Sequence, residues 1–146
     1  METLTLKELA PYLPYGLKVI WSDGKIDTIN SKLSEKNNEE NEVSLQLALY
    51  AFEIPHNYLK PILYPLDYLT KPITHNGETF VPSDRTMVGM QHGRIYKNIG
   101  IVQNRLNTNT IFYNDMVYLL SLRFDVFNLI NRGLAIPITE TFNPYK

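Results

Sequence analysis

The stretch from Asp115 to Gly133, DMVYLLSLRFDVFNLINRG, constrains the fold more than any other part of the chain. At 3.6 residues per turn, the residues that share one broad apolar face are Met116, Val117, Leu120, Phe124 and Phe127. The one clean polar stripe consists of Ser121, Asp125, Asn128 and Arg132. A helix with so narrow a polar face must be covered, so we predict a final helix over Asp115–Arg132 that packs on a sheet.

The predicted helix has signals at both ends. Asn114 or Asp115 can accept backbone N–H groups as the N-cap, and an acidic residue suits the positive end of the helix dipole. Arg132 lies near the negative end, and Gly133 suits the left-handed C′ position. A solvated stripe is the simplest interpretation of Asp125 and Arg132, and a paired, partly buried role is the alternative.

Composition limits the classes of protein to consider. A length of 146 residues favours a single domain, 1–146, with its own hydrophobic core. The net charge of −1 provides no global positive field for nucleic acid or anionic lipid, and the absence of cysteine excludes disulfides and thiolate chemistry. We see no secretory signal and no apolar run near the roughly 20 residues of a membrane span, so we expect a soluble, cytoplasmic protein without a membrane partner.

The N-terminal third contains a helix signal followed by a hairpin signal. Thr5-Leu6-Lys7-Glu8 matches a capping box and predicts a short helix, Leu6–Ala10, which Pro11 stops and a rigid bend follows. Two β-prone runs, Leu17–Trp21 and Lys25–Asn30, flank Ser22-Asp23-Gly24 and predict a hairpin.

The next segment changes from polar to apolar. Residues 31–42 are mostly charged or amide side chains and predict a mobile polar loop within the domain. Val43–Phe52 then alternates with period 2, which predicts a long strand at the centre of the sheet.

Prolines divide the middle of the chain. Four of them between residues 54 and 72 argue against long helices and central strands, and leave one helical turn at Leu66–Leu69. Asn76-Gly77, between Ile73–His75 and Glu78–Val81, predicts a hairpin with a type I′ turn. For residues 86–110 the sequence does not decide between a strand and a helix that includes Asn98–Leu106. The tail at 136–138 is an edge strand or an extended arm.

These elements predict an α+β fold: a single compact domain with an antiparallel sheet of two hairpins plus a long strand, and a C-terminal helix packed on one face. Three segments also carry a resemblance. LAPYLPYGLKV, LKPILYPLDYLTKPITHNGETFVP and FDVFNLINRGLAI, about half of the chain, resemble a family of short uncharacterised proteins from prophages and other mobile elements of gut Bacteroides-type bacteria. The resemblance implies a phage-related accessory role and transfers no activity and no site residue.

No catalytic, cofactor-binding or metal-binding residue is assigned from the sequence. The histidines, His56, His75 and His92, are isolated; a metal clip of His75 with Glu78 is the alternative to an exposed hairpin flank. The carboxylates near the prolines, Glu53, Asp67 and Asp84, have no spacing that indicates an acid/base pair. The glycine-containing segment 89–94 is a weak phosphate-loop pattern, and a flexible connector is the favoured interpretation.

The tyrosines are the strongest candidates for binding. The chain has ten, and those held near prolines are Tyr12, Tyr15, Tyr58, Tyr64 and Tyr68. Packing over a sheet edge is the simpler interpretation, and a protein interface, which uses broad tyrosine faces on a stiff backbone, is the alternative. Basic residues are interleaved with aromatics at Lys60, Lys71, Arg85, Arg94 and Lys97, as on a single-stranded nucleic-acid platform, although nearby acids dilute their charge.

We therefore expect a non-enzymatic protein-interaction protein of mobile-element origin that needs no cofactor. Its expected partner is another protein, and a second copy of the chain is a further candidate. The alternatives are a nucleic-acid-binding accessory factor, which the charge balance disfavours, and a small enzyme with an unrecognised site.

Overall fold

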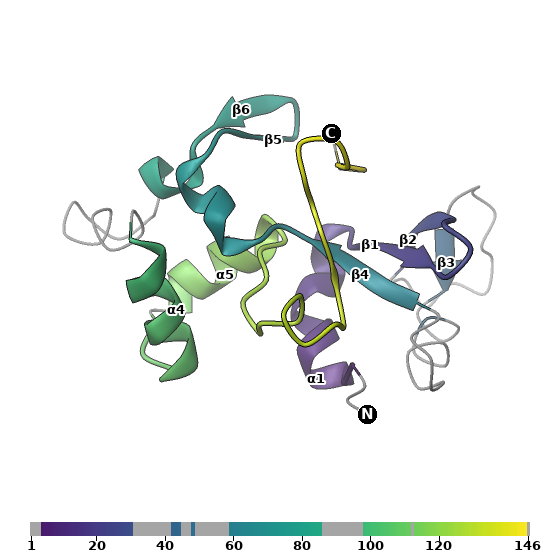
Figure 1. The fold of residues 1–146 in the computed structure, drawn as a ribbon, viewed down its shortest axis with the longest axis horizontal. Helices are drawn as coiled ribbons and strands as arrows, with labels where there is room; N and C mark the ends of the chain where they lie inside the picture. Colours follow the sequence, from purple (N-terminus) through teal and green to yellow (C-terminus); the bar gives the residue numbers. More distant parts are fainter. Residues whose placement is uncertain are drawn as a thin grey trace.

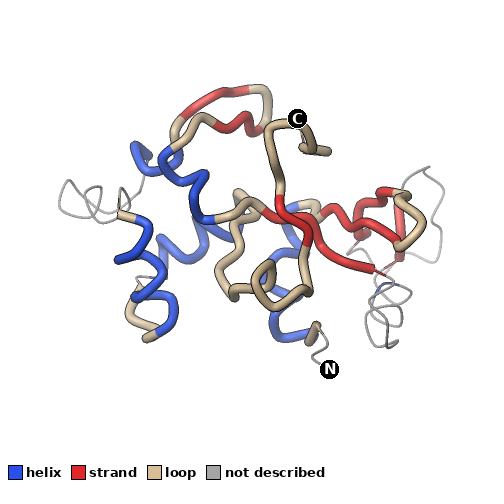
Figure 2. Tube along the Cα trace, in the orientation of Figure 1, coloured by secondary structure: helices blue, strands red, loops and turns tan. Residues whose placement is uncertain are grey.

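The computed structural model describes residues 4–30, 42–44, 48, 59–85, 98–111 and 113–145. These residues form a five-stranded sheet, a two-stranded β-ribbon and helices, which confirms the α+β class (Figure 1). Strand order in the larger sheet is β3-β2-β1-β4-β7, and the ribbon pairs β5 with β6. Figure 2 shows that most of the larger sheet lies on one side of the molecule and most of the helices on the other.

The larger sheet is mixed, whereas the sequence predicted an antiparallel one. The predicted first hairpin is confirmed: β1 (Lys18–Trp21) pairs antiparallel with β2 (Ile26–Asn30), and β4 (Leu59–Leu63) lies antiparallel on the other side of β1. The two outer strands, β3 (Glu42–Ser44) and β7 (Ile136–Pro137), run parallel to β2 and β4 respectively. No tight turn connects β3 to β2 or β7 to β4, so the turn residues in the sequence could not indicate the direction of either outer strand.

The predicted long central strand, Val43–Phe52, is wrong. Strand β3 ends at Ser44, it lies at the edge of the sheet, and Ala48 is helical and fully buried. Beyond Leu47 both sets of alternate positions carry apolar side chains, and such a run fits a buried helix as well as a strand. The predicted polar loop also needs one correction, because Glu42 belongs to β3; residues 31–41 lie outside the described residues.

The proline-rich segment contributes a central strand, which the sequence argued against. Pro61 lies in the middle of β4 and opposite Val19 of β1. The backbone N–H of Ile29 donates to the carbonyl of Leu17 over 2.9 Å, so alternate residues of β1, including Val19, direct their hydrogen bonds toward β2. Pro61 therefore occupies a non-hydrogen-bonded position, where its missing N–H removes no bond between β1 and β4.

The N-terminal capping box is confirmed, but the chain does not stop being helical at Pro11. Helix α1 (Leu6–Leu9) begins with reciprocal hydrogen bonds between Thr5 and Glu8. It continues directly into the 3₁₀ helix η1 (Ala10–Tyr15), because a proline is tolerated in the first turn of a helical segment. Gly16, with φ of 69°, then ends the helical segment.

The predicted second hairpin is confirmed, and it forms a separate ribbon. Strands β5 (Ile73–His75) and β6 (Glu78–Phe80) are antiparallel, and both turn residues, Asn76 and Gly77, have the positive φ of a type I′ turn. Two 3₁₀ helices flank this ribbon, η2 (Leu66–Thr70) before it and η3 (Pro82–Arg85) after it. In Figure 1 the ribbon stands away from the larger sheet, beyond η2.

The segment that the sequence left open between a strand and a helix contains helix α4 (Ile99–Asn107). The side chain of Asn98 caps it by accepting the backbone N–H of Ile101. Helix α5 (Tyr113–Ser121) begins before the predicted N-cap residues, so Asn114 and Asp115 lie inside it. Asp115 is fully buried, and neither of its carboxylate oxygens has a hydrogen-bond partner within the described part of the chain.

The predicted final helix, Asp115–Arg132, is wrong beyond Ser121. The backbone N–H of Arg123 donates to the carbonyl of Leu120, and that of Phe124 to the carbonyl of Leu119, both over 3.0 Å. This pair of bonds is a Schellman motif, in which Arg123, with φ of 64°, takes the left-handed C′ position that glycine usually occupies.

The chain after the Schellman motif lies beside the end of β4 instead of packing across the larger sheet as a helix. The backbone N–H of Tyr64 donates to the carbonyl of Arg123, and that of Asp125 to the carbonyl of Tyr64, each over 2.9 Å, so Phe124 forms an isolated parallel bridge with Tyr64, the residue after β4. A further turn ends at Gly133, with φ of 76°, where the predicted C′ conformation is found. Helix α5 itself packs on η1. Phe124 is fully buried, although no helix presents it.

Candidate functional site

A cavity of about 370 Å³ opens between η2, the β5–β6 ribbon and the C-terminal segment. We call it the tyrosine pocket. Its lining residues come from three parts of the chain: Tyr64, Tyr68 and Pro72 before the ribbon, Ile73, Thr74 and Thr79 in it, and Thr139, Glu140 and Asn143 near the C-terminus. Tertiary structure therefore brings the walls together. For example, Asn143 donates a hydrogen bond to the hydroxyl of Tyr64, which lies 79 residues earlier in the chain.

The two tyrosines of the pocket have different roles. Tyr64 is 2% exposed, and its ring packs at 5.5 Å from the ring of Phe124 and 5.4 Å from that of Tyr68. Burial raises the pKa of Tyr64, while the hydrogen bond that its hydroxyl accepts from Asn143 acts in the opposite direction. Tyr68 is only partly buried, and the ammonium of Lys71 lies 5.0 Å from its ring centroid. Tyr64 thus forms the floor, and Tyr68 an accessible wall.

The ribbon wall is held by side-chain contacts. Thr74 and Thr79 face each other across the two strands, and their hydroxyl oxygens are 3.0 Å apart. Arg85 forms an ion pair with Glu78 and also lies 4.3 Å from the ring centroid of Phe80. These contacts fix the ribbon against η3, so a ligand meets a wall that is already formed.

The C-terminal wall is anchored by Tyr145, whose hydroxyl lies between β1 and β4. The backbone N–H of Lys18 donates to this hydroxyl, and the hydroxyl donates to the carbonyl of Ile62, each over 2.8 Å. The sheet register places Lys18 opposite Ile62, so the hydroxyl takes the place of the next ladder hydrogen bond. Arg123 lies over the Tyr145 ring at 4.1 Å, and burial raises the pKa of Tyr145.

Glu140 is the acidic group of the pocket lining. Its side chain is exposed, and it has no hydrogen bond or ion pair within the part of the chain that the structure describes. The other lining residues contribute hydroxyls, one amide and apolar surface. The pocket therefore combines an aromatic wall, hydrogen-bonding groups and an uncompensated carboxylate.

The metal clip considered for His75 has no third ligand among the residues that the structure describes. His75 and Glu78 are directly opposed in the ribbon, but the Glu78 carboxylate is hydrogen bonded to Arg85. Burial lowers the pKa of His75, and the positive charge of Arg123 lowers it further. Among the described residues, no three His, Asp or Glu side chains form a group that could hold a metal ion.

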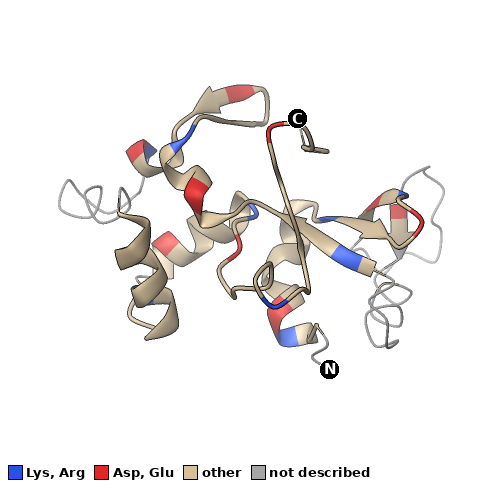
Figure 3. Cartoon of the chain, in the orientation of Figure 1, with Lys and Arg blue, Asp and Glu red and all other residues tan. Residues whose placement is uncertain are grey.

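Among the described residues, the remaining candidates form no second site. Asp67 and Asp84 are both exposed, on η2 and η3, whereas Glu53, His56, His92 and residues 89–94 lie outside the described residues. Of the basic residues considered for nucleic acid, Lys60 is partly buried on β4, and Arg94 and Lys97 are not described. Figure 3 shows basic and acidic residues interspersed along the described chain, with no continuous basic stripe in that view.

The structure brings together Tyr64 and Tyr68 among the five predicted interface tyrosines. Tyr12 is 1% exposed, so its ring is not available to a partner, and its hydroxyl donates to the carbonyl of Phe124. Tyr15 is partly buried, and its carbonyl accepts two hydrogen bonds from Arg123. Tyr58 lies outside the described residues.

Sequence reasoning missed the polar half of the pocket. A two-residue turn at Asn76-Gly77 places Thr74 opposite Thr79, so the contact between these two threonines could have been predicted from the sequence. Nothing local to Glu140 or Asn143 indicates that the C-terminal segment returns to Tyr64. That contact depends on the path of the chain after α5.

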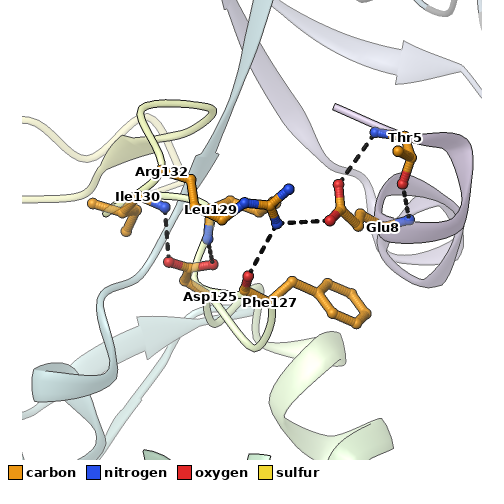
Figure 4. A network of polar contacts seen from close by, with 7 residues as sticks. All are labelled: Thr5, Glu8, Asp125, Phe127, Leu129, Ile130 and Arg132. Carbon is orange, nitrogen blue, oxygen red and sulfur yellow. Dashed lines mark hydrogen bonds and ion pairs between the residues drawn. The ribbon is translucent and has the colours of Figure 1, made fainter. Parts of the chain in front are cut away.

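Two residues of the polar stripe predicted on the final helix, Asp125 and Arg132, belong instead to a partly buried network (Figure 4). Both carboxylate oxygens of Asp125 accept backbone N–H groups, from Leu129 over 2.7 Å and from Ile130 over 3.0 Å. Burial raises the pKa of Asp125, and these hydrogen bonds and the charge of Arg132 oppose the rise. Asp125 is only 7% exposed, and its carboxylate accepts the hydrogen bonds that organise the turn after it. The solvated interpretation of Asp125 is therefore wrong.

Arg132 connects this turn to the N-terminal helix, as Figure 4 shows. Its guanidinium donates to Glu8 over 2.7 Å and to the carbonyl of Phe127 over 3.4 Å. Burial acts to raise the pKa of Glu8, but the bonds and charge of Arg132 and the bonds with Thr5 outweigh it, so that pKa is lowered. This network serves the fold, because its groups are engaged with one another and with the backbone.

Comparison of the sequence with protein-family models, with curated proteins and with solved structures found no match in any of the three. Within the described residues, every helix is too short or too polar to cross a bilayer.

Proposed function

We propose that this protein is a non-enzymatic interaction protein of mobile-element origin, which binds another polypeptide through the tyrosine pocket. The observation that carries the proposal is the pocket itself, where an accessible tyrosine ring and an unpaired carboxylate lie between two walls of fixed structure. Tyrosine is enriched at protein interfaces because one side chain supplies a broad apolar face and a hydroxyl.

The size of the pocket supports a side chain as its occupant. Ligand sites commonly span roughly 300–1,000 Å³, and the volume here, about 370 Å³, is near the lower limit. A dinucleotide or a comparable cofactor would overfill it. One or two side chains of a partner fit this volume, with the rest of the partner lying over the ribbon and the C-terminal segment.

The rigidity of the walls supports binding without a large ordering cost. The Thr74–Thr79 contact holds the ribbon, and the hydrogen bond between Asn143 and Tyr64 holds the C-terminal segment against the floor. Because these side chains are already ordered, a partner that enters the pocket immobilises few further groups on this chain.

The proposal is tested by filling the pocket and measuring association. Thr79→Arg places a long charged side chain at an exposed pocket position, and Asn104→Arg makes the same change in charge and bulk on the exposed face of α4. We expect wild type and Asn104→Arg to retain a partner from host lysate, or to self-associate by light scattering, and Thr79→Arg to lose this association.

Two results would contradict the proposal. One is a strictly monomeric wild-type protein that retains no partner. The other is association that persists unchanged in Thr79→Arg while that variant stays folded, because the interface would then lie elsewhere.

A further inference from the structure

We propose that the tyrosine pocket receives the ammonium group of a lysine side chain from the partner, with the Tyr68 ring and the Glu140 carboxylate as its recognition groups. This inference rests on the proposed function and specifies the partner chemistry. It follows from the charge of the lining, from an intramolecular contact that the structure already contains, and from the hydrogen-bonding capacity of the walls.

The charge of the lining favours a cation. Glu140 is the acidic lining residue, it is exposed, and it lacks an ion-pair partner within the described residues. The other lining side chains are formally neutral. A ligand anion would therefore meet repulsion without a compensating cation in the lining, whereas an ammonium group gains a counter-ion.

The Tyr68 ring already interacts with an alkylammonium group. Lys71 of the same chain places its Nζ 5.0 Å from the ring centroid, within the range of about 6 Å for a cation–π contact. Lys71 is exposed and forms no ion pair among the described residues, so its ammonium can leave the ring at little cost. The chain thus contains a model of the proposed contact, and also a competitor for it.

The walls offer acceptors that an ammonium group needs. A lysine ammonium has three donors and no acceptor, and each hydroxyl oxygen has two lone pairs. The hydroxyls of Thr74 and Thr79 share one hydrogen bond, which leaves further lone pairs on two oxygens that belong to pocket-lining residues. The lysine stem, which is apolar, suits the adjoining surface of Pro72 and Ile73.

The direct test uses a short, otherwise neutral peptide with one central lysine, and the same peptide with norleucine in that position. Amide chemical shifts of the full-length protein are followed by NMR during titration, because a single side chain is expected to bind with a dissociation constant on the order of 1 mM. We expect shifts at the pocket residues with the lysine peptide and none with the norleucine peptide. Equal binding of both peptides would overturn the proposal.

Three variants assign the contacts. Tyr68→Leu and Glu140→Gln should each weaken lysine-peptide binding by about two- to five-fold, as expected for an exposed cation–π contact and an exposed ion pair. Asp23→Asn, in the β1–β2 turn, removes the same charge at a distant exposed position and should leave binding unchanged. Lys71→Met removes the competing ammonium and should bind as tightly as wild type or more tightly. Unchanged binding in both pocket variants would refute the assignment.

The two proposals fail in distinguishable ways. If Thr79→Arg loses its partner but the lysine peptide gives no shifts, the interaction function stands and the lysine inference is wrong. If Thr79→Arg keeps its partner, the pocket is not the interface, and the interaction function fails together with any inference about the partner's lysine.

Discussion

Tyr12→Phe is the sharpest test of how the chain after α5 is held. The Tyr12 hydroxyl donates to the carbonyl of Phe124 over 2.5 Å and accepts the backbone N–H of Val126 over 3.2 Å, and both bonds are buried. The hydroxyl therefore bridges the two ends of a bend that lies 112 residues away in sequence from Tyr12. Phenylalanine keeps the ring, including its edge-on contact with Phe127 at 6.2 Å, and removes only the hydroxyl.

The expected loss follows from the two hydrogen bonds. A buried hydrogen bond contributes about 1 kcal/mol net, and a buried group left without a partner costs about 1–3 kcal/mol. The N–H of Val126 retains a 3.0 Å contact with the carbonyl of Phe124, so neither group is left entirely without a partner. Two groups left wholly without partners would cost about 2–6 kcal/mol. We therefore expect Tyr12→Phe to lower the free energy of unfolding by about 1.5–3 kcal/mol, at the low end of that range.

Urea denaturation monitored by circular dichroism measures this loss, and a thermal melt should shift by roughly 3–12 °C for a chain of this size. Tyr113→Phe is the matched control, because it removes the same hydroxyl from a residue that is 80% exposed. The control should lie within about 0.5 kcal/mol of wild type. If Tyr12→Phe is no more destabilising than Tyr113→Phe, the hydroxyl does not hold the bend.

Three further changes test the other contacts that organise the fold. Tyr145→Phe removes the hydroxyl that bridges β1 and β4 and should cost about 1–2 kcal/mol in urea denaturation; an unchanged midpoint would show that the strands close without it. Arg123→Met removes two hydrogen bonds to the carbonyl of Tyr15 and should cost about 1–3 kcal/mol, and Arg123→Lys should recover less than half because an ammonium lacks the planar fork. Full recovery by lysine would exclude the geometric explanation. Glu8→Gln should cost about 1 kcal/mol at pH 7, because the folded state lowers the pKa of Glu8 and favours its ionised form beside Arg132. This difference should disappear as the pH falls below the ordinary glutamate value of about 4.3 and through the lowered pKa, and a difference that grows in acid would have the wrong sign.

Local signals predicted the elements whose structure is decided by neighbouring residues. The Thr5–Glu8 capping box and the Asn76-Gly77 turn were found as predicted, because the groups that satisfy the backbone lie within a few residues. The hairpin of β1 and β2 followed for the same reason. The α+β class follows from the presence of such elements of both kinds.

Patterns longer than a few residues were less reliable. Period 3.6 over Asp115–Arg132 and period 2 over Val43–Phe52 both describe which side chains are apolar, and the apolar side chains of both segments are buried or partly buried where they are described. Burial, however, does not require one continuous element. The apolar side chains of residues 122–130 reach the core from turns, with Phe124 fully buried beside the end of β4.

The candidate site divides in the same way. Stiff tyrosines near prolines were visible in the sequence, and two of them, Tyr64 and Tyr68, line the pocket. Glu140 and Asn143 could not be associated with them, because that contact requires the C-terminal segment to return to η2. The burial of Tyr12 was equally invisible, since its partners, Phe124 and Val126, lie more than a hundred positions away.

By itself, the sequence determined where helix α1 and the two hairpins begin, because caps and turn residues act over three or four positions. Tertiary structure decided where the last helix ends. Arg123 adopts a left-handed conformation, which costs roughly 1–2 kcal/mol for a residue with a Cβ, because its guanidinium then reaches the carbonyl of Tyr15 and the ring of Tyr145. Hydrogen bonds to Tyr64, the residue after β4, add to that gain, and a periodic pattern cannot anticipate bonds made by residues so distant in sequence.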